Sequence, residues 1–238
     1  MRVYFSTYHL WASEEFAKRT KSLEAAQNGM PRFDIEHRAH VMVSLTEAGA
    51  FLESLINELF KDCADNHMAY IGGLSAHSIH ALATRWADWH RKGGRRPGTL
   101  EKFDAALVCC GLPPMNHGIA PIQDAKQVLE LRNALMHAKP ESATDDSLAF
   151  ANLKSKFPAN ALTRGTNCAF FPDKCLGSGC ALWAAKSTRI FADHFHVLIG
   201  TCRIPDDCID SKRYPLFIAR TVLRELIESL EPTGSVKP

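Results

Sequence analysis

The chain has 238 residues, of which 46% are hydrophobic and 23% are charged, the balance of an ordinary globular protein. Its formal net charge is only +2. This excludes a protein that binds nucleic acid through overall charge, so a surface for phosphates would have to come from local clustering.

Neither a targeting segment nor a membrane span is visible in the sequence. Residues 1–16 include Glu14 and Glu15 and have no sustained apolar stretch, which is a poor match to a signal peptide. No apolar run approaches the roughly 18 to 20 residues that a membrane helix needs. We therefore expect a cytoplasmic protein that does not contact a membrane.

The eight cysteines form no C-x-x-C pair. In such a chain they are typical of small buried hydrophobic residues or reduced thiols. Cys168, Cys175 and Cys180 are close in sequence, and His194 and His196 follow. A small metal-binding protein built on these cysteines and His194 is one functional alternative, although the spacing fits no zinc motif. We expect neither a metal nor a cofactor.

The N-terminal part of the chain predicts mainly helix. Residues 3–8 are compatible with a strand or an irregular lead-in, and residues 13–26 have helical character. From residue 38 to about residue 65, apolar residues recur at helical spacing: Val41, Leu45, Ala48, Leu52, Leu55, Ile56 and Leu59. Asn66 and the Gly72-Gly73 pair then break this pattern.

Three further helices are predicted before residue 140. Ser75 is suited to cap a helix over residues 76–90, and a glycine-rich turn at residues 92–98 ends it. Thr99 is suited to cap a helix that continues to residue 108. The next helix covers about residues 121–138, with Pro121 in its first turn and Pro140 beyond its end.

The C-terminal part predicts a short helix over residues 145–156, an irregular stretch over 157–179, and helices over 181–198 and 214–230. No βαβ alternation is visible, so the prediction is an all-α antiparallel helical bundle. We expect a lead-in over residues 1–33 that packs on the bundle, a helical domain over 34–230 and a frayed tail over 231–238. Within the domain, residues 34–138 form the core and residues 180–230 add C-terminal helices.

The helix predicted over residues 121–138 has two different faces. One side carries an apolar stripe that suits the core of a bundle: Val128, Leu131 and Leu135. Asn133 and His137 fall nearly opposite, about 40° apart, and Arg132 lies between the stripe and this polar pair. Because Leu129 and Met136 are interleaved with the polar residues, this face suits a second buried surface, such as the interface of a two-fold dimer. Both copies would then contribute an arginine and a histidine to one cleft.

The motif Arg132-Asn133-x-x-x-His137, near the end of a bundle helix, resembles the signature of the HEPN family (higher eukaryotes and prokaryotes nucleotide-binding domains). The stretch from Phe51 to Leu59 also resembles the long first bundle helix of such proteins. The resemblance covers residues 34–138. It implies an all-α, HEPN-like antiparallel bundle that forms a homodimer, with the later helices completing or padding the bundle.

The resemblance also implies metal-independent cleavage of RNA, the activity of the active members of the family. Arg132 would bind the scissile phosphate, His137 would act as general base or acid toward the ribose 2′-hydroxyl, and Asn133 would orient one of them. The products would carry a 2′,3′-cyclic phosphate and a 5′-hydroxyl. Such an endoribonuclease would suit a toxin or defence effector, and a toxin would have an antitoxin protein as its partner.

An alternative function follows from relatives that keep the fold without nuclease activity. The chain would then be a catalytically inactive helical module that binds a nucleotide or a protein partner. In the simplest local interpretation, Arg132 and Asn133 cap and bridge neighbouring helices, and His137 interacts with the C-terminus of its own helix.

A glycine-rich turn carries four basic residues in close succession: Arg91, Lys92, Arg95 and Arg96. Such a turn would suit the phosphates of an RNA backbone, which supply affinity without sequence choice. The simpler interpretation is a solvated turn whose cations lie at a helix C-terminus. Trp86 and Trp89 precede this turn and are interpreted as base-stacking groups or, more simply, as core or interface anchors.

Glu53 and Asn57 lie one turn apart on the helix over residues 38–65 and are candidates for the surroundings of Arg132. A carboxylate near His137 would raise the pKa of this histidine and fix its tautomer. The simpler interpretation is a structural or exposed Glu53. Two histidine pairs share helix faces without further ligands at suitable spacing, so we interpret them as surface or capping residues: His37 with His40 and His77 with His80.

Overall fold

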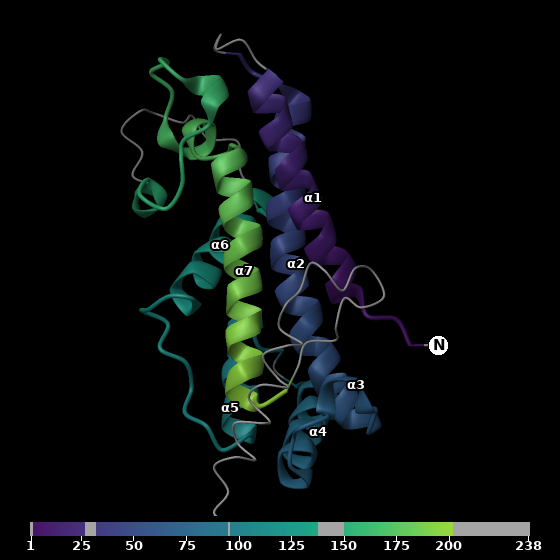
Figure 1. Ribbon diagram of the computed structural model, residues 1–238. Helices are drawn as coiled ribbons and strands as arrows, with labels where there is room; N and C mark the ends of the chain where they lie inside the picture. Colours follow the sequence, from purple (N-terminus) through teal and green to yellow (C-terminus); the bar gives the residue numbers. More distant parts are fainter. Residues whose placement is uncertain (1, 27–31, 95, 138–149, 202–238) are drawn as a thin grey trace, which may run out of the picture.

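The computed structural model describes residues 2–26, 32–94, 96–137 and 150–201. Every regular element among these residues is a helix, and none is a strand, so the predicted all-α fold is confirmed. Three long helices run side by side (Figure 1): α1 (Phe5–Ala26), α2 (Ile35–Asp65) and α7 (Ser178–Ile199). Helix α2 lies between the other elements and contacts most of them.

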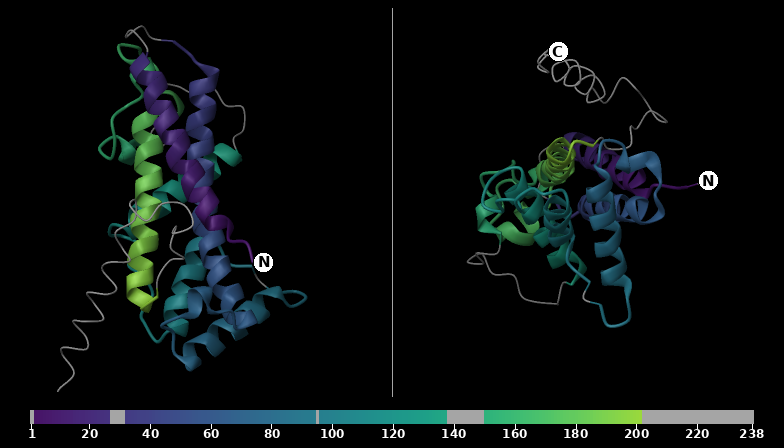
Figure 2. Two further views of the ribbon diagram at one scale, coloured as in Figure 1. Left: turned by 45° about the vertical axis from the view of Figure 1, so that its right-hand side comes forward. Right: turned by 90° about the horizontal axis from the view of Figure 1, so that it is seen from below.

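The shorter helices cover the C-terminal half of α2 and its remaining side (Figures 1 and 2). They are α3 (Met68–Ile71), α4 (Ala76–His90), α5 (Thr99–Cys109) and α6 (Ile122–Met136). Helices α3, α4 and α5 gather at one end of the bundle, whereas α6 crosses α2 and α7 obliquely. The connection between α6 and α7 contains short helical turns at Ala151–Leu153, Ala161–Thr163 and Phe170–Lys174.

The core consists of two buried clusters along α2. The first joins the N-terminal half of α2 to α6, to the start of α7 and to residues 153–176, with Leu45 and Leu131 fully buried. The second joins the C-terminal half of α2 to α4, α5 and the end of α7, where the Phe103 ring packs edge-on against two rings of α7. These two clusters fix the α2 backbone at both of its ends. The face of α2 between α5 and α6, which carries polar side chains, therefore has a rigid backbone.

One of the two predicted N-caps is confirmed. The Ser75 hydroxyl accepts the backbone N–H of Ser78 at 3.1 Å at the start of α4. Asp34 caps α2, which begins slightly earlier than the apolar pattern indicated. The cap predicted at Thr99 is wrong, because Gly98 precedes α5 and the Glu101 carboxylate accepts its N–H at 2.8 Å.

The strand or irregular lead-in predicted over residues 3–8 is also wrong from residue 5 onward, where α1 has already begun. The buried face of α1 is made mostly of small and polar residues, which give no apolar periodicity: Ser6, Leu10, Ser13, Ala17 and Thr20. These residues allow close approach, since the Ser13 and Ser44 hydroxyls each donate to the other residue's backbone carbonyl at 2.9 Å.

The C-terminal predictions are tested only in part. The irregular stretch over residues 157–179 is confirmed apart from its short turns and the first residues of α7, while the short helix expected over 145–156 is reduced to the turn at Ala151–Leu153 within the described residues. The helix over 181–198 is confirmed as α7. The predicted helix over 214–230 and the tail over 231–238 lie outside the described residues.

Glu24 joins the three long helices at one end of the bundle. Its carboxylate, on α1, lies 2.9 Å from His37 Nε2 on α2 and accepts the Ser178 N–H of α7 at 2.7 Å and the Ser178 hydroxyl at 2.6 Å. Burial alone would raise the pKa of Glu24, but the hydrogen bonds from His37 and Ser178 outweigh burial and lower it. The charged carboxylate therefore stabilises the native state.

We predict that Glu24→Gln lowers the free energy of unfolding at pH 7 by about 1–3 kcal/mol, because a hydrogen-bonded charge is lost from a nearly buried site. A lowered folded-state pKa contributes stability that is present above the ordinary pKa of 4.5 and is lost as the pH falls through the folded-state value. The difference between parent and variant, measured by urea unfolding, should therefore shrink below pH 4.5.

The control is Glu130→Gln, which removes an exposed carboxylate 3.9 Å from Lys126. Such a surface pair contributes about 0–1 kcal/mol, so this variant should unfold like the parent at every pH. A loss in Glu24→Gln that stayed constant with pH would contradict the assigned role of Glu24.

Candidate functional site

Arg132 lies on α6 where this helix crosses α2, and its aliphatic stem rests on the α2 backbone at Gly49. A Cβ atom placed on Gly49 would lie 3.3 Å from Arg132 Cγ and 3.5 Å from both Cδ and Nε. Glycine is otherwise unfavourable in the middle of a helix. At this position the missing side chain leaves the space that the arginine stem occupies.

The guanidinium of Arg132 has partners at its two terminal nitrogens but not at Nε. Its Nη1 donates to Asn133 Oδ1 at 3.1 Å, and its Nη2 lies 3.8 Å from Glu53 Oε2 on α2. Its Nε is buried and has no hydrogen-bond partner among the described residues. Buried donors are normally satisfied, so the hydrogen bonding of this guanidinium is incomplete among the described residues.

Asn133 and His137 complete the predicted motif on the surface. Both are exposed, and the His137 N–H donates to the Asn133 carbonyl at 3.0 Å. His137 is the C-cap of α6, so it lies just beyond the last helical turn instead of within it. Its imidazole makes no hydrogen bond or ion pair with any other described residue. The neighbouring Met136 side chain is 56% exposed, so this end of α6 presents mixed apolar and polar atoms to solvent.

The apolar stripe predicted for this helix is confirmed as its buried face. Val128 and Leu131 are fully buried, and Leu135 packs against the same cluster. The predicted second contact surface around Asn133 and His137 remains open in the single chain. The dimer that would cover this surface stays a prediction.

Glu53 and Asn57, predicted to surround Arg132, behave differently. Glu53 pairs with Arg132 and not with His137. Asn57, one turn further along α2, accepts a hydrogen bond at 2.8 Å from Nζ of Lys102 on α5. Sequence reasoning missed Lys102, because only the packing of α5 on α2 brings it to this face.

Lys102 is a half-buried cation in the same polar cluster. Burial lowers the pKa of Lys102, Glu53 counteracts this effect, and the charge of Arg96 adds to it. Glu53 thus pairs with Arg132 and also acts electrostatically on Lys102. We call Glu53, Asn57, Lys102, Arg132 and Asn133 the polar cluster.

The basic residues of the turn between α4 and α5 lie in different surroundings. Arg91 is the C-cap of α4 and lies 3.9 Å from Asp88, and Lys92 is exposed. These positions agree with a solvated helix end. Arg95 lies outside the described residues, and Arg96 is exposed. The charge of Arg96 lowers the pKa of Lys102, so this part of the turn acts on the polar cluster electrostatically.

The candidate tryptophans and two of the candidate histidines pack against neighbouring side chains. Trp86 and Trp89 both contact the ring of buried Phe60, at 6.2 Å and 4.7 Å between centroids, so they are core anchors. The interpretation of His37 as a surface or capping residue is wrong, because His37 is buried against Glu24. His40 packs edge-on against Phe16.

The suggested metal site is not assembled. Cys175 and Cys180 are buried neighbours, and burial raises the pKa of Cys180. His194 follows Cys180 by 14 residues of α7, which is about 21 Å along the helix. Within the described ranges, no three histidine, cysteine or acidic side chains come together to hold a metal ion.

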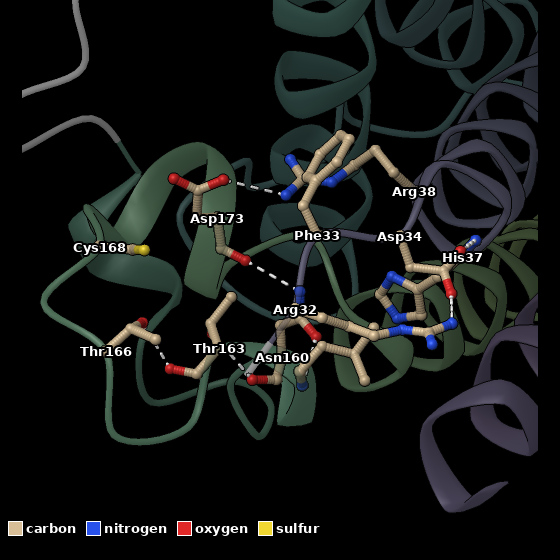
Figure 3. Close-up of a pocket in the computed structure, with 11 residues that line it drawn as sticks. Arg32, Phe33, Asp34, His37, Arg38, Asn160, Thr163, Thr166, Cys168 and Asp173 are labelled. Atoms are coloured by element: carbon tan, nitrogen blue, oxygen red, sulfur yellow. Dashed lines mark hydrogen bonds and ion pairs between the residues drawn. The ribbon is translucent and has the colours of Figure 1, made fainter. Parts of the chain in front are cut away.

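A separate pocket of about 240 Å³ lies at the N-terminus of α2, against residues 160–173 (Figure 3). Arg32 pairs there with Asp34, and Arg38 Nη2 pairs with Asp173 at 3.0 Å. The Arg38 guanidinium also lies 5.8 Å from the centre of the exposed Phe33 ring. About 15 residues of α2, or roughly 20 Å, separate this pocket from Glu53.

Comparisons with known proteins add no family to this geometry: no protein family, curated protein or solved structure matches the chain. Among the described helices, none combines the length and apolar character needed to cross a membrane.

We predict that Gly49→Leu destabilises the protein by about 1–3 kcal/mol through overpacking against the Arg132 stem. The cost should fall in an Arg132→Ala background, because the stem is then absent. A double-mutant cycle measured by urea unfolding should give a coupling of about 0.5–3 kcal/mol. Additive effects of the two substitutions would show that Gly49 does not make the space for Arg132.

Proposed function

We propose that the chain is a HEPN-type, metal-independent endoribonuclease whose reacting groups are Arg132, Asn133 and His137. The observation that supports this most is the guanidinium of Arg132, which is oriented by Glu53 and Asn133 and has a buried Nε–H without a partner. Such a group is suited to bind one phosphate oxygen with little reorganisation. An exposed imidazole follows five residues later on the same helix.

The proposed reaction is attack of the ribose 2′-hydroxyl on the adjacent phosphorus. His137, as general base, takes the 2′-hydroxyl proton while the bond between O2′ and phosphorus forms. The bond from phosphorus to O5′ breaks, and O5′ takes a proton from solvent or from a second imidazole. The products are a 2′,3′-cyclic phosphate and a 5′-hydroxyl. Arg132 stabilises the charge that develops on the phosphate oxygens.

A homodimer is part of this proposal. Asn133, Met136 and His137 are exposed on α6, and a two-fold contact there would bring a second Arg132 and a second His137 to the same cleft. The second histidine would supply the proton for O5′. The cellular role we propose is that of a toxin or defence effector, which as a toxin would be restrained by an antitoxin protein.

A second candidate function is ligand binding without catalysis, and the pocket at the N-terminus of α2 favours it. Arg32 and Arg38 keep further N–H groups beyond those in their ion pairs, and Phe33 offers an exposed ring. A small anionic ligand with a planar group, such as a nucleotide, would suit this lining. This candidate requires no cleavage of RNA.

We predict that purified protein cleaves RNA in excess EDTA and that His137→Ala lowers the rate by about a hundredfold to ten-thousandfold, the usual contribution of a general acid or base. Arg132→Ala should cause a comparable loss. The measurement follows total RNA and transfer RNA by gel, and end analysis identifies the cyclic phosphate.

The matched control is His77→Ala, which replaces an exposed histidine on α4. This variant should cleave like the parent, and both histidine variants should keep the parent's unfolding midpoint. Equal cleavage by the parent and His137→Ala would refute the assignment of His137, and absence of cleavage by the parent would favour the binding function.

A further inference from the structure

Lys102 is the cation of the polar cluster that the ribonuclease proposal leaves without a role. Its ammonium donates to Asn57 at 2.8 Å and lies near Glu53, the residue that also pairs with Arg132. The charge of Arg96, from the turn before α5, also acts on this ammonium and lowers its pKa. Cations from α6 and α5 therefore flank Glu53 and Asn57 on one face of α2, and the turn adds a third cation that acts on Lys102.

We propose that Arg132, Lys102 and Arg96 form a phosphate track that binds successive phosphates of single-stranded RNA. The scissile phosphate would lie at Arg132, and the following phosphates along the strand would lie at Lys102 and Arg96. This inference rests on the proposed function, because it extends the same site by the part of the substrate beside the scissile bond.

The surroundings of Lys102 support a role in binding an anion. A cation that is partly removed from water is usually paired with a carboxylate. Lys102 instead donates to a neutral amide oxygen, and its pKa is lowered by burial, an effect that Glu53 only partly offsets and to which the charge of Arg96 adds. A bound phosphate would restore the favourable surroundings that burial and the neighbouring cation remove.

The half-buried position of Lys102 explains why the strand should be single. A flexible strand bends to bring one phosphate to a recessed ammonium, whereas a double helix is stiff on this length scale. Attack by a 2′-hydroxyl also requires the sugar-phosphate backbone to leave the regular helical geometry. Phosphate contacts supply affinity without reading bases, so the track implies little sequence preference.

The test measures binding separately from cleavage. The probe is a fluorescent single strand of about twelve nucleotides whose riboses are all 2′-O-methylated, so that no 2′-hydroxyl can attack. Fluorescence anisotropy gives its affinity for the parent, Lys102→Met and Arg96→Ala across a range of salt concentrations. Lys102→Met keeps the apolar stem and removes the charge, and Lys102→Arg restores it. Lys61→Ala is the control, since Lys61 lies on α2 in an ion pair with Asp65.

We expect Lys102→Met and Arg96→Ala each to weaken binding about tenfold and to reduce the slope of log affinity against log salt by about 0.7. Lys102→Arg and Lys61→Ala should bind like the parent. A 2′-O-methylated dinucleotide, with a single phosphate for Arg132, should bind the parent and Lys102→Met equally.

Unchanged affinity of Lys102→Met for the long strand would overturn the track, and so would an equal loss for the dinucleotide. Failure of the proposed function has a different result. The parent would then leave unmodified RNA intact while the long strand still bound more weakly to Lys102→Met. Urea unfolding of each variant shows whether a lost affinity reflects a lost fold.

Discussion

Burial of α2 on several sides is the constraint on which the rest of the structure depends. Its sequence places large apolar side chains around much of its circumference, including Phe51, Leu55 and Phe60, all buried. A helix of this kind exists only when other elements cover it. Helices α1 and α7 cover its length, α3, α4 and α5 cover its C-terminal half, and α6 crosses the remaining side. The polar cluster lies where this cover is incomplete, between α5 and α6.

The crossing of α6 over α2 explains how a charged side chain comes to lie on a buried surface. Gly49 lets the Arg132 stem reach the α2 backbone, so its methylenes are buried while its charged end reaches Glu53 and Asn133. Burying a guanidinium is costly unless its donors are used. The unpartnered Nε is therefore a local energetic cost within the fold.

Features fixed by neighbouring residues were predictable from the sequence, and features fixed by packing were not. The Ser75 cap, the apolar period of α2 and the buried stripe at Val128 and Leu131 are local patterns, and all three are confirmed. The early start of α1 was not predicted, because its buried face is rich in serine and threonine and therefore shows no apolar periodicity. Lys102 was missed because its position depends on the docking of α5. The Arg-x4-His spacing is itself common in this chain: Arg32 to His37 has it too, yet these residues pair with Asp34 and Glu24.

The exposure of His137 connects the chemistry to the assembly state. Arg132 is oriented within one chain, but His137 lies beyond the last turn of α6 and is open to water. Electrostatic stabilisation and directed proton transfer are strongest where water is excluded. For the proposed reaction, a single copy therefore supplies an ordered guanidinium without an enclosed imidazole. A two-fold partner on the exposed face of α6 would enclose it and would add the second proton-transfer group that cleavage needs. Ligand binding needs neither, so catalysis and binding without catalysis differ in whether this face is covered.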